Sequence, residues 1–295
     1  MAYANGFNGD VKSLQYILQT LAAKEILIPG VTSNAGLQVS AMGEVAYFYR
    51  RGASTVETDA NLGAQITYAS RGVERVDVPL TNRIAIGAVI PHVNFATVEG
   101  VQVVADRVVQ ESLSAANEWN TEAVGFLEAN ADRFFDTSNK TVQTTKVFDN
   151  AALTKTNIYQ EIVEMRKGFN LLNKVRGLKP TAIIVSEAVY ALLLQSDEFI
   201  RKEQAQDLTV VSEGLVGRVV GLDVVVSPDM LADIIMLHAE AIAAPVNIRT
   251  LLTTDATAAG YPGGTIVAGE IGYGFEIGDL DLVLIREVAT APNNG

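Results

Sequence analysis

Hydrophobic and polar residues alternate along an extended part of the chain. The alternating stretches are 45–49, 66–68, 76–80 and 84–90. A period of two predicts β-strands, and glycines between the stretches mark the turns. Pro79 restricts its strand to an edge or a bulge. We therefore predict a long hairpin over residues 44–91, with a polar tip at 52–64, that projects from the body of the molecule.

The pattern then changes to spacings of three and four residues, which predicts one unbroken amphipathic helix from about 97 to 130. Its apolar stripe consists of Val101, Ala105, Val108, Ser112, Ala115, Trp119, Ala123 and Phe126. Its polar side carries Gln102, Asp106, Gln110, Glu118 and Glu122. About 34 helical residues span on the order of 50 Å, so this helix should run across the molecule as a spine.

A second helix is predicted over 157–176. Asn157 and Gln160 have the spacing of a capping box, and Gly177 stands where a left-handed cap is needed. The other predicted elements are a helix near 14–21, strands at 181–185, 223–226 and 234–237, a helix at 187–194 capped by Ser186, and strands at 265–268, 272–277 and 281–285. This order of elements indicates an α+β fold.

Composition narrows the classes of function. Hydrophobic residues make up 48% of the chain, which is enough for a sizeable core. The 34 acidic residues exceed the 22 basic ones, and this balance argues against a nucleic-acid-binding domain. An acidic surface is compatible with lining a space that holds DNA. The absence of cysteine excludes disulfides and thiolate chemistry, and we find neither a secretory signal nor an apolar run long enough for a membrane span.

No pattern of catalytic residues stands out. The chain has two histidines, His92 and His238, and no Gly-Lys pair that could form a Walker loop. The glycine-rich stretches 214–221 and 272–278 lead into strands, so tight turns and close packing explain them better than a nucleotide site. Asp279-Leu-Asp281 is the best candidate for a metal site, although two solvated turn residues are the simpler interpretation. We predict a protein without cofactor, metal or enzymatic activity.

The predicted hairpin carries charges of both signs. Between positions 50 and 83 lie five arginines and four acidic residues. Near balance of the two signs suits contact with an acidic or mixed neighbouring surface, and a solvated loop is the alternative. The candidate contact residues are Arg50, Arg51, Glu57, Asp59, Arg71, Glu74, Arg75 and Asp77.

Residues 214–228, GLVGRVVGLDVVVSP, and the following 234–242, IIMLHAEAI, resemble a recurrent stretch of the major capsid proteins of tailed bacteriophages. Residues 178–190, LKPTAIIVSEAVY, are similar to the strand-then-helix unit of that family. The order of hairpin, long helix, αβ unit and returning strands resembles the Hong Kong 97-like capsid fold over nearly the whole chain.

The resemblance implies a division of the chain. Residues 1–43 would form an N-terminal arm and 44–91 the E-loop hairpin. A peripheral domain with the spine helix would comprise 92–149 and 246–295, and an axial domain would comprise 150–245. The function implied is that of a major head protein, which assembles in the host cytoplasm into the icosahedral shell of the virion and encloses double-stranded DNA without sequence-specific binding.

The resemblance also implies partners. Copies of the chain would form hexamers and pentamers, with each E-loop lying across the neighbouring subunit. Only about forty residues precede the hairpin, so we expect a separate scaffolding protein or self-nucleated assembly, together with a portal and a decoration protein. No lysine lies between Lys24 and Lys140, so the isopeptide cross-link that some family members make from the E-loop is not expected.

Two alternatives stay open. The shell protein of an encapsulin-like cellular compartment has the same fold, and cargo enzymes inside purified particles would reveal it. A soluble enzyme built on the αβ unit belongs to another class, and a ligand-dependent melting temperature would favour it.

Overall fold

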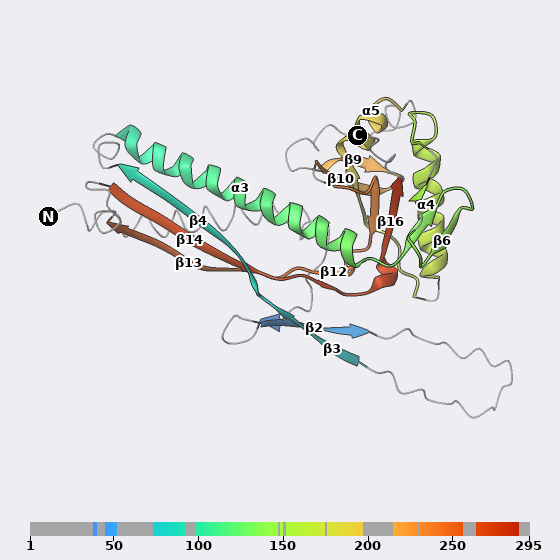
Figure 1. Ribbon diagram of the computed structural model, residues 1–295, viewed down its shortest axis with the longest axis horizontal. Helices are drawn as coiled ribbons and strands as arrows, with labels where there is room; N and C mark the ends of the chain where they lie inside the picture. Colours follow the sequence, from blue (N-terminus) through green and yellow to red (C-terminus); the bar gives the residue numbers. More distant parts are fainter. Residues whose placement is uncertain are drawn as a thin grey trace, which may run out of the picture.

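The molecule consists of a lobe built on one eight-stranded sheet, a 33-residue helix that extends from it, and two smaller three-stranded sheets (Figure 1). The structure is a computed structural model. It describes residues 38–39, 45–51, 73–91, 98–146, 148–149, 152–174, 176–196, 215–228, 230–255 and 264–288. In this part of the chain, no helix is long and apolar enough to cross a membrane.

The lobe contains a mixed sheet with strand order β6-β5-β16-β11-β8-β10-β9, and β7 pairs with β16. Its strands are β5 (Phe134–Asp136), β6 (Thr141–Gln143), β7 (Phe148–Asp149), β8 (Ala182–Ser186), β9 (Leu215–Val219), β10 (Leu222–Ser227), β11 (Ile234–Leu237) and β16 (Val283–Val288). Helices α4 (Ile158–Leu172) and α5 (Glu187–Leu194) contribute buried residues to the same core. Strand β8 runs parallel to β10 and antiparallel to β11.

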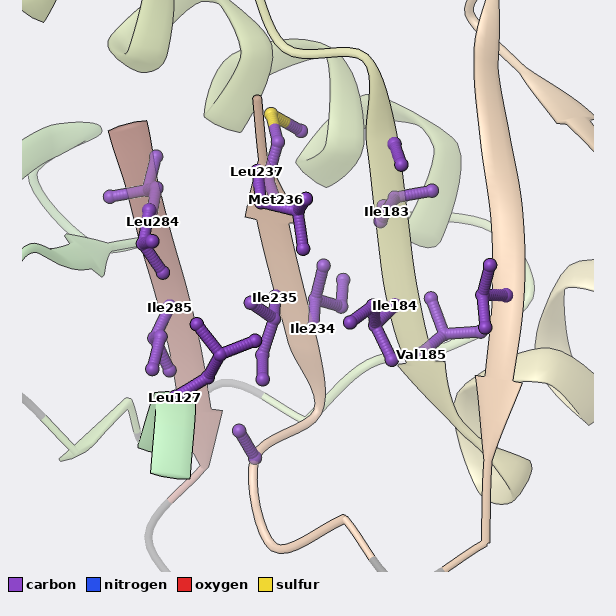
Figure 2. Close-up of a cluster of buried hydrophobic side chains, with 14 of the residues drawn as sticks. Leu127, Ile183, Ile184, Val185, Ile234, Ile235, Met236, Leu237, Leu284 and Ile285 are labelled. Atoms are coloured by element: carbon purple, nitrogen blue, oxygen red, sulfur yellow. The ribbon is translucent and has the colours of Figure 1, made fainter. Parts of the chain in front are cut away.

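Both faces of the central strands are buried. All four residues of β11 are fully buried, as are residues 182–185 of β8. Because neither face meets water, these strands have continuous apolar sequences instead of alternating ones. Figure 2 shows their side chains together with Leu284 and Ile285 of β16 and with Leu127, which enters this core from the long helix.

The long helix, α3 (Val98–Asn130), confirms the helix predicted over 97–130. Ala115, Trp119 and Ala123 of the predicted stripe are buried, whereas Glu118 and Glu122 are exposed. Beside α3 lies a three-stranded antiparallel sheet with order β13-β14-β4, formed by β13 (Val246–Asp255), β14 (Gly264–Tyr273) and β4 (Asn82–Pro91) (Figure 1). Helix and sheet together give the molecule its elongated shape.

Most predicted elements of the lobe are present, with shifted ends. Strands β8, β10 and β11, helix α5 and its cap Ser186 are confirmed. Gly177 has the left-handed backbone conformation predicted for it, with a φ of +67°. The capping box is wrong, because the Asn157 side chain makes no cap hydrogen bond to α4 and instead accepts one from the backbone of Thr154. Helix α4 also ends at Leu172, before the predicted end at 176. The helix predicted near 14–21 lies outside the described residues.

The predicted hairpin is corrected in one respect. Residues 82–91 form β4, which pairs along its full length with β14 and therefore belongs to the sheet beside α3. Its apolar residue Ile84 packs against the main core. Among the described residues, the hairpin comprises 45–51 and 73–79. The predicted stretch 66–68 and the polar tip at 52–64 lie outside the described residues.

The C-terminal strands also differ from the prediction. Gly269 lies inside the ten-residue β14 and does not separate two strands. The long β13, which pairs with β14, was not predicted. A two-residue strand, β15 (Glu276–Ile277), pairs with β12 (Ile242–Ala243), and a 3-10 helix over Leu280–Leu282 precedes β16.

The two-sided burial of β8 makes a quantitative prediction. Ile184→Ala removes a fully buried side chain and should lower the free energy of unfolding by about 2–5 kcal/mol. Leu171→Ala is the control, because Leu171 is 64% exposed at the end of α4 and its loss should change stability by only about 0.5 kcal/mol. Chemical denaturation measures both, and equal losses would contradict the position of the core.

Candidate subunit-contact site

The candidate contact residues lie on a small antiparallel sheet at the side of the molecule. Its strands are β1 (Gln38–Val39), β2 (Val45–Arg51) and β3 (Val73–Pro79), with β2 in the centre. Strands β2 and β3 pair from Val45 opposite Pro79 to Arg51 opposite Val73. We call this β2–β3 pair the ribbon. Figure 1 shows it beyond the body, on the side of the β13-β14-β4 sheet that faces away from α3.

One face of the ribbon is apolar and buried. Ala46 and Val78 are directly opposite each other and fully buried. They form a small cluster with Leu80 and with Ala243 of β12, and Phe48 packs against it. This cluster is separate from the core of the lobe. In the described residues, this small cluster attaches the buried face of the ribbon to β12 of the body.

The opposite face carries aromatic and charged groups. The Arg75 Nε donates a hydrogen bond of 2.7 Å to the Asp77 carboxylate, and its guanidinium lies 4.3 Å from the centre of the Tyr47 ring. Tyr49 is 52% exposed and meets the Tyr47 ring edge-on at 6.1 Å. We call these four residues the outer face of the ribbon.

Arg75 of the outer face carries its charge throughout the physiological pH range. The hydrogen bond to Asp77 raises the pKa of the Arg75 guanidinium above its already high ordinary value. Arg75 and Asp77 are both more than half exposed, so their pairing contributes little to stability. Tyrosine and arginine are enriched at protein–protein interfaces, where they combine large contact area with hydrogen bonding. The arrangement suits binding to another protein surface.

The structure brings together only some of the predicted contact residues. Arg75 and Asp77 form an ion pair, and Arg50 stands opposite Glu74 in the strand register, beside Arg51 at the end of β2. The predicted residues Glu57, Asp59 and Arg71 lie outside the described residues.

Sequence reasoning did not single out the two tyrosines of the outer face. The alternation in β2 leaves open whether Tyr47 and Tyr49 or Ala46 and Phe48 face the body, because a strand has two faces. The register decides it: Ala46 pairs with Val78 and Phe48 with Val76, so the apolar residues of β3 share a face with Ala46 and Phe48.

The other sequence candidates have structural partners. Asp279 caps the 3-10 helix and pairs with Arg176, while Asp281 pairs with Arg133 at 2.8 Å. In the described ranges, no three acidic or histidine side chains gather where a metal ion could bind. Both acids of the candidate metal site therefore already have cationic partners.

The histidine and the glycine-rich stretches are explained in the same way. Burial lowers the pKa of His238, and its Nδ1 accepts a hydrogen bond of 3.1 Å from the backbone of Glu240. Gly221, with a φ of +77°, forms the turn between β9 and β10. A side chain at Gly278 would collide with the carbonyl oxygen of Glu240. His92 lies outside the described residues.

Comparisons with known proteins give a result at the level of structure alone. No protein-family model matches the sequence, and no curated protein matches it. Among solved structures, the capsid of cyanophage P-SCSP1u is similar with a TM-score of 0.56 and 14% identity, over 86% of each chain. The mature capsid of bacteriophage PhiM1 is similar with a TM-score of 0.54 and 14% identity, over 88% of each chain. The chain has the fold of these phage capsid proteins.

A third solved structure, from Mycobacterium phage Che8, is similar to the same extent. Its TM-score is 0.54 at 14% identity, over 83% of this chain and 84% of that one. Coverage this high on both sides means that the capsid fold extends over most of the chain and is not limited to the αβ lobe. Sequence identity this low means that the likeness is one of architecture.

In this capsid fold, the two faces of the ribbon should respond differently to mutation. Val78→Ala removes buried methyl groups and should lower the stability of the ribbon against local opening by about 1–3 kcal/mol. Tyr49→Ala should change it by less than about 1 kcal/mol, since Tyr49 is half exposed. Native-state hydrogen exchange of the β2 and β3 amides measures both. A larger loss for Tyr49→Ala would reverse the assignment of the faces.

Proposed function

We propose that this chain is the major capsid protein of a tailed bacteriophage, a structural subunit and not an enzyme. The observation that carries the proposal is the likeness to two capsid structures over 86% and 88% of both chains. A shared fold does not by itself fix function, so the ribbon matters as a second observation. It has an exposed aromatic and charged face, and its described apolar face packs in a small cluster that is separate from the core of the lobe.

We assign the parts of the chain by the division expected from the family, changed where the strand pairing requires it. Residues 1–43 are the N-terminal arm and 44–91 contain the E-loop, of which the ribbon is the base. Helix α3 is the spine helix of the peripheral domain, expected over 92–149 and 246–295, and 150–245 forms the axial domain. Strands β5, β6, β7 and β16 depart from this division, because they share one sheet with β8 to β11 and so belong with the axial lobe. Strand β4 pairs with β14, which supports assigning it to the peripheral sheet.

Assembly follows from the geometry of a projecting arm. An arm that binds a different surface on the next copy makes a heterologous contact, and such contacts close into rings when the rotation between copies allows. Hexamers and pentamers of this kind then tile a closed shell. Each contact can be weak because every subunit makes several at once. Arg50, Arg51, Arg71 and Arg75 pair with acidic groups on the neighbour and fix its register more than they supply affinity.

The proposed partners are other copies of the chain, a separate scaffolding protein, a portal and a decoration protein. The shell assembles in the host cytoplasm and becomes the capsid of the virion. A formal net charge of −12 is compatible with enclosing DNA without binding it tightly. Because no lysine occurs between positions 24 and 140, subunits are held together by non-covalent contacts in this part of the shell.

An encapsulin-like compartment is the second candidate for a shell protein of this fold, but no particular observation favours it. A soluble enzyme is less well supported, because the candidate catalytic and metal-binding groups in the described residues have structural partners.

Electron microscopy of the purified protein tests the proposal. We expect closed icosahedral particles, formed alone or after co-expression with a scaffolding protein, that contain no cargo enzyme. Particles that package a cellular enzyme would identify an encapsulin. A discrete small oligomer under all of these conditions, with a melting temperature that rises on ligand binding, would contradict a shell function altogether.

Charge reversal tests the role of the arginines in the hairpin. Arg71→Glu with Arg75→Glu should strongly reduce the yield of particles while leaving a folded subunit, because like charges would face the acidic neighbour. Arg71→Lys with Arg75→Lys keeps the charge and is the matched control, which should assemble. Sedimentation measures the yield and circular dichroism the folding. Normal yield from the glutamate variant would exclude these residues from the contact.

A further inference from the structure

The ribbon and helix α3 both contact one short segment, residues 273–277, which runs from the last residue of β14 through β15. Tyr273 is the last residue of β14 and pairs with Asn82 of β4. Gly274 and Phe275 follow, and Glu276 pairs with Ala243 of β12. The ribbon contacts one side of this segment and α3 contacts the other, so the segment links the two, in addition to the direct continuation of β3 into β4.

The contact with the ribbon is made by backbone atoms. A Cβ added to Gly274 would collide with the carbonyl oxygen of Pro79, the last residue of β3, and would touch Val78. Any residue other than glycine would therefore push the ribbon away. Ala243, which pairs with Glu276, is also a member of the apolar cluster beneath the ribbon. Backbone contact without intervening side chains fixes the angle between the two more rigidly than flexible groups would.

The contact with the helix is aromatic. The ring of Phe275 lies 5.2 Å from Trp119 and 5.6 Å from Phe126, both on α3. The neighbouring Tyr273 is buried, and its hydroxyl donates a hydrogen bond to Glu122 of the same helix. Burial, aided by that carboxylate, raises the pKa of Tyr273, so the hydroxyl stays a donor throughout the physiological range. Aromatic pairs at these separations favour particular ring geometries.

We infer that Gly274 and Phe275 are positioning residues that set the angle of the ribbon relative to α3 and transmit a displacement of the ribbon to the environment of Trp119. The inference deepens the proposed function and rests on it, because binding of the ribbon to a neighbouring subunit supplies the displacement. Two consecutive residues carry the coupling: Gly274 touches the ribbon and Phe275 touches the helix. A shift of β3 therefore has a path of only two residues to α3.

The first test needs no assembly. Gly274→Ala should displace Pro79 and increase hydrogen exchange of the β2 and β3 amides about tenfold in the isolated subunit. Gly87→Ala is the matched control, since a Cβ at Gly87 in β4 meets nothing within 4 Å, and it should leave exchange unchanged. Equal exchange in both variants would overturn the positioning role of Gly274, whether or not the protein forms shells.

The second test uses the only tryptophan of the chain as a reporter. During assembly of the wild-type protein the emission of Trp119 should shift, whereas Phe275→Leu should assemble with little or no shift and with normal exchange in the ribbon. A full emission shift in Phe275→Leu, or none in wild-type protein that does form particles, would overturn the coupling. Failure of the wild-type protein to form any particle would instead count against the proposed function, while the exchange experiment still decides the role of Gly274.

Discussion

The structure depends on apolar burial of the second half of α3 in the core of the lobe. Ala123, Val124 and Leu127 belong to the same buried cluster as the central strands β8, β11 and β16. A helix of this length, roughly 50 Å, is thus held firmly at one end by side chains that water cannot reach. The sheet of β13, β14 and β4 lies along the helix, so the burial that fixes the direction of the helix also fixes the direction of this sheet.

Polar contacts complete this junction. The Glu128 carboxylate, near the end of α3, accepts hydrogen bonds of 2.8 and 2.7 Å from the backbone N–H groups of Leu231 and Ala232. Inside the lobe, the buried Arg286 of β16 donates to Asp233 at 2.9 Å and to Thr137 at 3.1 Å. A buried charge left without such partners would be strongly destabilising. These contacts therefore hold Asp233, just before β11, and Thr137, just after β5, against β16.

Local patterns were enough to predict several elements. The stripe at spacings of three and four defined α3 because a helix displays its burial pattern within its own sequence. The short apolar runs of β8 and β11 were recognisable because both of their faces are buried. Strand β13 was not, since its sequence, VNIRTLLTTD, mixes polar and apolar residues and depends on pairing with β14, a partner that the sequence does not reveal.

The candidate site was predictable only in outline. The charges of the hairpin are visible in the sequence, but the face on which each charge lies depends on the pairing register of β2 with β3. Strand β4 is not part of the hairpin, because it pairs with β14, a distant segment of the chain. The contact between Gly274 and Pro79 joins residues almost two hundred positions apart and has no signal in either segment.

The internal pairing of Arg75 with Asp77 has a consequence for how copies of this acidic chain approach one another. With the two charges cancelling, this patch meets another molecule as a small dipole, whose attraction falls off more steeply with distance than that of a single charge. Long-range repulsion between chains of net charge −12 then dominates until the surfaces nearly touch. Encounters in dilute solution are thereby disfavoured, and ionic strength becomes a control on when subunits first associate.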